Sequence, residues 1–251
     1  MDLGLEGRVA IVTGASRGIG LAVVERLVAE GCEVVAVSRA AVDGPGHHVA
    51  ADVTDPGAAG RVVGECLERF GRLDVLVNNA GGAEPAALDR LTDADWQRAF
   101  EFNFFAAVRF AASCVPVMRE RRWGRMVHVA SVSGREPDHR FAPYSAAKAA
   151  LLNFSTSLSQ AYAADGVLSS CVVPGITLTE LVAANAAGTA ARTGSSPDEV
   201  MARQLEHHRV AAGRFGEPGE VAAAVAFLAG EPAGWITGAT LEVDGGTLRS
   251  V

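Results

Sequence analysis

Tyr144 and Lys148 are the two residues whose types and spacing most directly suggest chemistry. They lie four residues apart in Tyr-Ser-Ala-Ala-Lys, so in a helix their side chains share one face, one turn apart. A nearby ammonium group favours phenolate and is expected to lower the pKa of Tyr144 from its reference value of about 10. Such a tyrosine can donate or accept a proton near neutral pH. Because the same spacing occurs by chance on solvated helix faces, other motifs must decide whether the pair is catalytic.

A glycine-rich segment, Thr13-Gly-Ala-Ser-Arg-Gly-Ile-Gly20, lies between an expected strand and an expected helix. Gly14 can make the turn after the strand, Gly18 permits close approach to a pyrophosphate, and Gly20 lets the helix pack on the sheet. The first turn of that helix offers N–H groups and a positive dipole end to phosphate. This context favours a dinucleotide site over a purely structural turn.

Strands and helices alternate along the chain. Strands are expected at residues 8–13, 34–37, 48–51, 73–78, 125–130, 168–173 and 240–243, and helices at residues 18–30, 56–70, 143–164 and 219–229. Two further helices are expected to begin at Thr92-Asp-Ala-Asp95 and Ser196-Pro-Asp-Glu199, which have the order of capping boxes. Strands that are apolar on both faces are typical of a parallel sheet covered by helices on both sides. The sequence therefore predicts an α/β, doubly wound Rossmann fold.

The chain has 251 residues and no long polar linker or internal repeat, so a single domain over residues 1–251 is predicted. Residues 183–196 are the nearest approach to a loop insertion, within a substrate loop or lid at about residues 180–214.

Net charge is −7, and the longest basic cluster is Arg119-Glu-Arg-Arg122, so nucleic acid is not an expected partner. No secretion signal or membrane-spanning run is evident, which predicts a cytoplasmic protein without a membrane partner. Core packing, rather than metal ligation or disulfide formation, is expected for the four scattered cysteines, Cys32, Cys66, Cys114 and Cys171.

The G-x-x-x-G-x-G spacing of the glycine loop resembles that of the short-chain dehydrogenase/reductase family. Further motifs match this family in order along nearly the whole chain: Asn78-Asn-Ala-Gly81, Asn103, Ser131 thirteen residues before Tyr144, Pro174-Gly175 with Thr179, Ile236-Thr-Gly238, and Val243-Asp-Gly-Gly246. Six motifs in the right order are far more specific than any one of them. The nearest general resemblance is to 3-oxoacyl-(acyl-carrier-protein) reductases and related ketoreductases.

The resemblance implies hydride transfer between a nicotinamide and a carbonyl carbon, with Asn103, Ser131, Tyr144 and Lys148 as the catalytic residues. Ser131 would hydrogen-bond the substrate oxygen, and Tyr144 would exchange the proton with it. Lys148 would lower the pKa of Tyr144 and hold the nicotinamide ribose. Asn103 would anchor a water molecule that passes protons toward Lys148.

The end of the second strand bears on the choice of cofactor. In NAD-preferring relatives an acidic residue stands there to bind the ribose hydroxyls, but this chain has Ser38 followed by Arg39. Arg39 and Arg17 would suit a 2′-phosphate, so NADP(H) is predicted in preference to NAD(H). By the resemblance, the cofactor-binding residues are Gly14, Ser16, Arg17, Gly18, Ile19, Gly20, Ser38, Arg39, Asp52, Val53, Asn79, Ala80, Gly81, Tyr144, Lys148, Pro174, Gly175, Thr177 and Thr179. The helix usual between residues 39 and 52 is expected to be truncated or absent.

Substrate recognition is expected in the lid at residues 180–214. Its apolar residues include Leu181, Val182, Met201 and Leu205, its basic edge Arg192, Arg203, His207, His208 and Arg209, and its candidate hinges Gly188 and Gly194. A basic edge would suit a thioester carrier or another anionic substrate. The charged loop of Glu136, Asp138, His139 and Arg140 is either solvated or in contact with a polar substrate.

The predicted function is NADP(H)-dependent interconversion of a ketone and a secondary alcohol, with a 3-oxoacyl thioester as the nearest substrate class. One alternative is an NAD(P)-dependent alcohol or hydroxysteroid dehydrogenase working oxidatively, and another is a non-enzymatic redox sensor that binds a dinucleotide. By the resemblance, the apolar helices at residues 95–119 and 144–164 pair across a two-fold axis in a homodimer or homotetramer.

Overall fold

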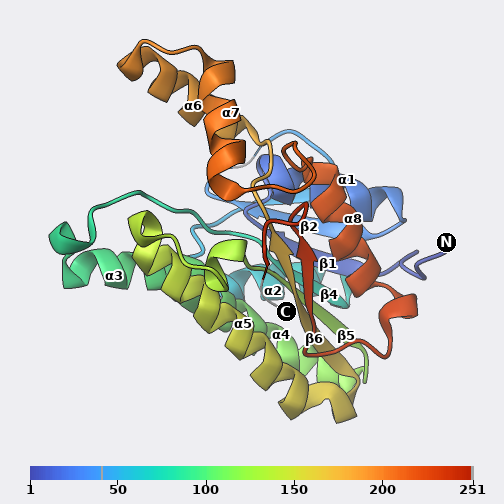
Figure 1. Cartoon of the computed structure of the whole chain (residues 1–251). Helices are drawn as coiled ribbons and strands as arrows, with labels where there is room; N and C mark the ends of the chain where they lie inside the picture. The colour runs from blue at the N-terminus through green and yellow to red at the C-terminus, as the bar shows by residue number, and fades with distance from the viewer. Residues whose placement is uncertain (41, 250–251) are drawn as a thin grey trace.

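A seven-stranded parallel sheet forms the centre of the computed structural model, which describes residues 1–40 and 42–249 (Figure 1). The strands are β1 (Val9–Thr13), β2 (Glu33–Ser38), β3 (His47–Ala50), β4 (Val75–Asn78), β5 (Gly124–Val129), β6 (Val167–Pro174) and β7 (Thr240–Val243). Their order is β3-β2-β1-β4-β5-β6-β7, and every neighbouring pair is parallel. The chain reverses its direction of winding between β1 and β4, the place where open α/β sheets bind ligands beyond the carboxyl ends of their strands.

Helices cover both faces of this sheet, which confirms the predicted doubly wound α/β fold. They are α1 (Gly18–Ala29), α2 (Ala58–Phe70), α3 (Asp93–Phe100), α4 (Ala106–Glu120), α5 (Ala142–Tyr162), α6 (Glu180–Thr193), α7 (Pro197–His208) and α8 (Pro218–Ala229). One face is covered by α1 and α8, and the other by α2, α4 and α5. The helices α6 and α7 extend beyond the carboxyl edge of the sheet (Figure 1).

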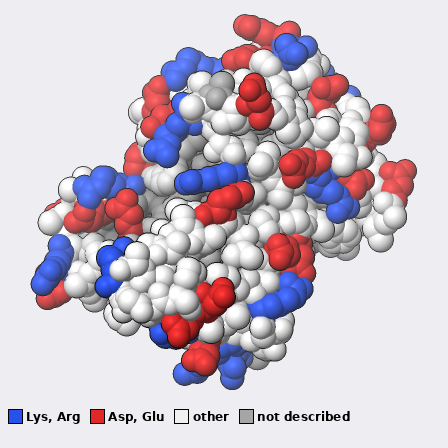
Figure 2. Space-filling view, turned by 90° about the horizontal axis from the view of Figure 1, so that it is seen from above, with Lys and Arg blue, Asp and Glu red and all other residues white. Residues whose placement is uncertain are grey.

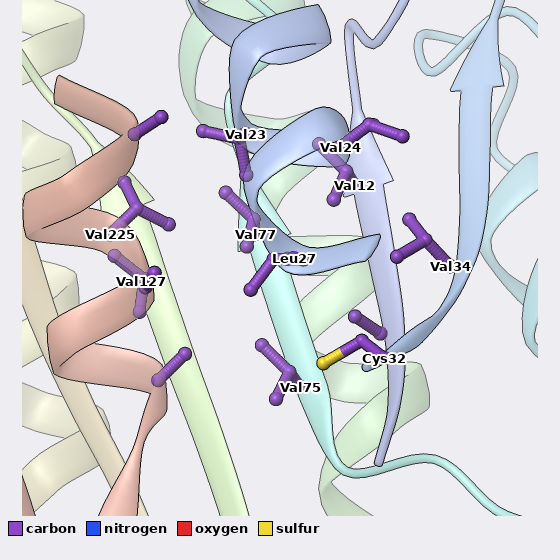
Figure 3. Packing of buried hydrophobic residues seen from close by; sticks show 14 of the residues in the cluster. Val12, Val23, Val24, Leu27, Cys32, Val34, Val75, Val77, Val127 and Val225 are labelled. Carbon is purple, nitrogen blue, oxygen red and sulfur yellow. The ribbon is translucent and has the colours of Figure 1, made fainter. Parts of the chain in front are cut away.

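Alternate strand residues supply the two halves of the core. Figure 3 shows Val23, Val24 and Leu27 of α1 packed beside strand residues such as Val12 and Val77. The next residues along the same strands point to the other face and join a second buried cluster under α2 and α4. This division explains why the strands lack the polar alternation of a half-exposed sheet. All four cysteines are free and buried, as predicted.

A buried carboxylate, Asp74, ties the amino-terminal ends of β1 and β4 together. Its side chain is 1% exposed, and its Oδ2 accepts a hydrogen bond from the backbone N–H of Val9 at 2.9 Å. Two nitrogens of Arg72 donate to the same carboxylate, each at 2.7 Å. The Arg8 guanidinium lies 3.5 Å from Oδ1. The charge of Asp74 is therefore compensated by two arginines although it lies at the base of the sheet.

The prediction of a loop insertion at residues 183–196 is wrong, because most of this segment is the helix α6. Thr179 caps its start, where the hydroxyl accepts a hydrogen bond from the Val182 N–H at 3.3 Å. Gly194 ends it in a left-handed conformation with φ of 70°. The many alanines that suggested a loop of small residues are the best helix formers. Gly188 lies inside the helix and is not a hinge, whereas Gly194 lies at a junction.

Both predicted capping boxes are present, at the starts of α3 and α7. Between residues 39 and 52, residues 42–46 form no helix, which agrees with the expected truncation; residue 41 lies outside the described residues. A π-helical turn, Glu101–Phe105, joins α3 to α4. The joined run Asp93–Glu120 has the length and mean hydropathy (28 residues, 1.2) of a membrane span. Core helices pass the same test, and α4 has seven buried residues, including Phe110 and Met118, in the core beside the sheet.

Candidate active site

A cavity of about 870 Å³ opens at the carboxyl ends of the strands, between the glycine loop, α5 and α6. Every residue predicted for cofactor binding lines it, as do Ser131, Tyr144 and Lys148. Asn103 is the single exception among the predicted residues. Figure 2 looks down on the molecule from the side of α6 and α7, and basic and acidic side chains are interspersed over this face. One continuous cavity therefore joins the expected cofactor site to the expected reacting groups.

Thr13 and Asn79 fix the glycine loop against the loop that follows β4. The Thr13 hydroxyl accepts hydrogen bonds from the backbone N–H groups of Asn79 and Ala80, both at 3.1 Å. The Asn79 amide donates in return to the carbonyls of Thr13 and Gly14, at 3.0 and 3.1 Å. A Cβ on Gly20 would lie 2.1 Å from the Gly14 carbonyl oxygen, so only glycine fits there. Gly20 was predicted to let the helix pack on the sheet, and in the structure it lets the helix approach the glycine loop at Gly14 and the Asn79 side chain.

The start of α1 leaves its N–H groups available to a ligand. Arg17 occupies the cap position without a side-chain hydrogen bond to the helix, and the first turn holds no acidic residue. The backbone of Gly18 and Ile19 lines the cavity at this point. Free N–H donors and the positive end of the helix dipole suit a pyrophosphate. The residues present thus fit a dinucleotide.

Ser131, Tyr144 and Lys148 form a compact group at the end of β5. Ser131 follows that strand, and its Oγ accepts a hydrogen bond from the Ser133 N–H at 3.1 Å. Tyr144 and Lys148 lie one turn apart on α5, with the Lys148 Nζ 5.7 Å from the centre of the tyrosine ring. Lys148 is 3% exposed and donates to the Val129 carbonyl at 2.7 Å. The structure therefore brings together three residues that the sequence separates by up to seventeen positions.

The expected net lowering of the Tyr144 pKa is wrong in sign. Burial raises the pKa of Tyr144 above its usual value, and a hydrogen bond with Ser131 opposes this change only in part. Burial also lowers the pKa of Lys148 to about 8, and the neighbouring Cys171 acts weakly in the other direction. Tyr144 is thus a neutral phenol at neutral pH, and Lys148 is mostly protonated.

Asn103 lies beside the cavity rather than in its lining. It is 2% exposed, within the π-helical turn, and its amide donates to the carbonyls of Gly82 and Ala99 at 3.0 and 2.9 Å. Its Oδ1 accepts from the Gly82 N–H at 2.9 Å. A Cβ on Gly81 would lie 2.8 Å from this Oδ1 and 3.2 Å from the Lys148 Nζ. Both amide hydrogens of Asn103 are committed to the backbone, so a bound water would use the second lone pair of Oδ1.

The far end of the cavity carries the residues predicted to contact the adenosine. The Ser38 hydroxyl donates to the Ala40 carbonyl at 2.6 Å and so stabilises the turn after β2. Asp52 accepts two hydrogen bonds from Thr54, which hold the pKa of its carboxyl below the usual value, and Arg39 adds to this effect. Arg17 and Arg39 line the cavity, and no described carboxylate lies within 4.0 Å of either guanidinium. Within the described residues, two guanidinium groups without a salt-bridge partner therefore line the cavity.

The charged loop before Tyr144 binds the lid instead of facing the cavity. Arg140 pairs with Asp138 at 2.6 Å and with the His207 Nε2 of α7 at 2.8 Å. The Arg140 guanidinium holds the pKa of Asp138 well below its usual range. None of Glu136, Asp138, His139 and Arg140 lines the cavity. These four residues therefore lie outside the cavity wall in this structure, and direct contact with a polar substrate stays a prediction.

Several lining residues were not singled out from the sequence. They come from α6, α7, the π-helical turn and the segments before α3 and α5: Pro85, Phe102, Phe141, Asn185, Thr189 and Gln204. Of the apolar lid residues, Leu181 and Val182 do line the cavity, whereas Met201 packs between α6 and α7. The helical spacing of Asn185, Thr189 and Arg192 is the signal that would have found this wall, had α6 been recognised as a helix.

Comparison with known proteins decides the family. A family model described as short chain dehydrogenase matches residues 8–190. The chain belongs to the short-chain dehydrogenase/reductase family. This short-chain dehydrogenase/reductase is 36% identical over 253 residues to the 3-oxoacyl-(acyl-carrier-protein) reductase of Salmonella typhimurium, covering 97% of this chain and 98% of the relative.

Two solved structures are similar to this short-chain dehydrogenase/reductase over nearly their whole lengths. The L-sorbose reductase of Gluconobacter frateurii, complexed with NADPH and L-sorbose, has a TM-score of 0.95 at 34% identity, with 100% of each chain covered. The ligand-free aldohexose dehydrogenase of Thermoplasma acidophilum has a TM-score of 0.90 at 31% identity, with coverage of 98% and 96%. Family membership makes this protein an oxidoreductase, and the cavity and its relatives support a nicotinamide dinucleotide as the cofactor.

Proposed function

We propose that this protein reduces a ketone to a secondary alcohol with NADPH. The observation that carries the proposal is that one cavity joins Arg17 and Arg39, which form no salt bridge with a described residue, to Ser131 and Tyr144. A 2′-phosphate would be bound by the arginines, because guanidinium groups form charge-assisted hydrogen bonds with phosphate oxygens. The absence of a carboxylate at the end of β2, where Ser38 stands, supports the same choice.

The nicotinamide, when bound, supplies the hydride. The residues of the chain then polarise the substrate oxygen and supply its proton. Ser131 accepts a hydrogen bond from the Ser133 N–H at 3.1 Å, and its own hydroxyl hydrogen, which bonds Tyr144 in this structure, can turn to the substrate oxygen. This donation stabilises the negative charge that develops on the oxygen. Tyr144 gives that oxygen its proton.

The protonation state of Tyr144 favours the reductive direction. A general acid must hold its proton before the reaction, and the raised pKa of Tyr144 satisfies this condition. Lys148, fixed on the Val129 carbonyl, is a cation that stabilises the phenolate left after proton transfer. In the oxidative direction the same tyrosine would have to begin as phenolate, which its buried position disfavours.

We propose a 3-oxoacyl thioester as the substrate. The 36% identity to a 3-oxoacyl-(acyl-carrier-protein) reductase over 97% of this chain supports this choice. A second candidate is a hydroxylated ketone such as a ketose, which the similarity to L-sorbose reductase favours. The two classes differ in charge and length, so direct comparison separates them.

The function is tested by following NADPH and NADH absorbance with acetoacetyl thioesters, L-sorbose and cyclic ketones. We expect oxidation of NADPH with a thioester, at a rate that exceeds the rate with L-sorbose. Turnover of L-sorbose alone would replace the first substrate class by the second. NADPH binding without turnover of any ketone would instead support a dinucleotide-binding sensor.

Replacement of Arg39 by alanine is expected to raise the KM for NADPH by about tenfold, since charge-assisted hydrogen bonds contribute about 1.5–3 kcal/mol before solvent exposure weakens them. NADH lacks the 2′-phosphate, so its KM should stay the same and serve as the internal control. Steady-state kinetics with both cofactors measure this. Equal changes for the two cofactors would show that Arg39 does not recognise the phosphate.

A further inference from the structure

One face of α6 carries a polar stripe toward the cavity. Asn185, Thr189 and Arg192 follow one another at spacings of four and three residues, so they lie on the same side of the helix. All three line the cavity. The other side is apolar, because Ala186 and Ala190 are buried against Val200 of α7. The polar residues therefore occupy the side of α6 that a substrate would meet.

Arg192 at the end of this stripe is a cation without an acidic partner. Its Nη2 donates to the Thr189 hydroxyl at 3.1 Å, and within the described part of the chain no carboxylate lies in salt-bridge distance of it. Four of its five N–H donors have no partner in the described residues. Glu180, the one acidic residue of α6, lies at the opposite end, about 18 Å away along the helix axis. Arg192 is thus available to a negatively charged group.

Gln204 of α7 reaches the same cavity and adds an independent signal. Its side-chain Oε1 is buried and has no hydrogen-bond donor among the described residues. A buried carbonyl oxygen without a donor is costly in free energy. An N–H or O–H group of a ligand would satisfy it, and amides and hydroxyls are the groups that offer such a donor.

The cavity lining changes from apolar to basic along α6. Leu181 and Val182 line the cavity at the start of the helix, beside Thr179 and the glycine loop, and Arg192 lies eleven residues beyond Leu181. Eleven residues of helix span about 16 Å. A ligand that reaches both ends of this wall must be elongated, with an apolar part, a hydrogen-bonding middle and an anionic end.

We propose that Arg192, with Asn185, Thr189 and Gln204, binds the distal anionic part of an elongated substrate whose middle carries amide or hydroxyl groups. The proposal rests on the proposed function, which places the reacting carbonyl at Tyr144. A 3-oxoacyl thioester of 4′-phosphopantetheine has this chemistry: an apolar acyl chain with the reacting carbonyl at one end, amides along the arm and a phosphate at the other end. Coenzyme A and a carrier protein both present the same arm.

The test compares the acetoacetyl thioesters of 4′-phosphopantetheine and pantetheine, which differ only in the phosphate. With saturating NADPH, Arg192→Ala should raise the KM for the phosphorylated thioester about tenfold and leave kcat unchanged, as expected when a binding contact is lost. The pantetheine thioester should be unaffected. Arg203→Ala is the matched control: the sequence places Arg203 on the same basic edge, but the structure places it outside the cavity lining, where it donates to the Ser195 hydroxyl at 3.0 Å.

Three results would overturn the proposal: equal KM values of the wild-type protein for the two thioesters, equal losses for both in Arg192→Ala, or a raised KM for NADPH in that variant. Calorimetric titration with unacylated 4′-phosphopantetheine and pantetheine tests the subsite without turnover. Tighter binding of the phosphorylated arm, lost in Arg192→Ala, would support the subsite even if no ketone were reduced, in which case only the proposed function would fail. Acetoacetyl-coenzyme A and an acetoacetyl carrier protein are then compared as substrates. The source of the arm is the substrate whose KM rises more in Arg192→Ala. An unchanged KM for both contradicts the proposal.

Discussion

Tyr144→Phe is expected to lower kcat/KM for ketone reduction by about 10²- to 10⁴-fold, the usual contribution of a positioned general acid. The substitution removes only the phenolic oxygen, which hydrogen-bonds Ser131 and carries the proton that the product oxygen needs. Because the aromatic ring is kept, the packing around α5 should persist. NADPH oxidation measures the loss, and fluorescence titration should show a much smaller loss of NADPH binding, because Tyr144 is only one of the many residues predicted to contact the cofactor.

Tyr162→Phe is the matched control for this experiment. Tyr162 is the only other tyrosine of the chain and lies at the last position of the same helix, α5, away from the cavity. Its ring stacks under the Arg119 guanidinium, 5.5 Å from the ring centre, and a phenylalanine can keep that contact. We expect unchanged kinetics in this variant. Wild-type activity in Tyr144→Phe would exclude Tyr144 as the proton donor.

Asp74→Ala is expected to lower the free energy of unfolding by about 3–5 kcal/mol, because it breaks a buried ion pair and removes the carboxylate partner of Arg72. Arg8 would keep its ion pair with Glu231, at 2.6 Å. Arg72 would lose two hydrogen bonds of 2.7 Å, and the Val9 N–H would lose its side-chain acceptor. Urea denaturation followed by circular dichroism measures the change. The remaining folded protein should keep its KM for NADPH, since Asp74 lies at the other end of the sheet from the cavity.

Asp55→Ala is the control that separates burial from bonding. Asp55 also accepts a hydrogen bond from an arginine, Arg61 at 2.6 Å, and from a backbone N–H, that of Gly57 at 2.9 Å. Its side chain is 46% exposed, against 1% for Asp74. Exposed pairs contribute little to stability, so Asp55→Ala should cost a small fraction of the loss in Asp74→Ala. Equal losses in the two variants would show that the buried position of Asp74 is unimportant.

The fold could be predicted from local patterns because most of its elements carry their own signals. The buried strands are short β-branched runs, and the helices at Thr92 and Ser196 begin with residues that cap them directly. The helix α6 also has local signals, because Thr179 caps its start and Gly194 follows its end, but it lacks a stripe of large apolar residues. Its buried side consists of alanines, Ala186 and Ala190, which become a core only because α7 packs on them. That contact is tertiary and does not show in the local pattern.

The site was predictable where motif residues meet in space and unpredictable where partners come from distant segments. The cofactor and reacting residues share one cavity because parallel strands end at the same edge of the sheet. The pairing of Arg140 with His207 joins residues 67 positions apart, and the charge pattern alone left it open. The direction in which the pKa of Tyr144 changes could not be predicted from the sequence either, because it depends on how deeply the phenol is buried.

The π-helical turn at Glu101–Phe105 has a consequence for how the long helix is divided. A π turn contains one residue more than an α turn, so it rotates everything after it by about 100° relative to an uninterrupted helix. Before the turn, α3 has no buried residue, whereas α4 after it has seven. The extra residue therefore changes which sequence positions face the core, and Asn103 lies within the turn where this change occurs. The exposed α3 and the buried α4 can thus each orient their own side chains. Asn103, at the junction between them, hydrogen-bonds the backbone of Gly82 at the edge of the active site.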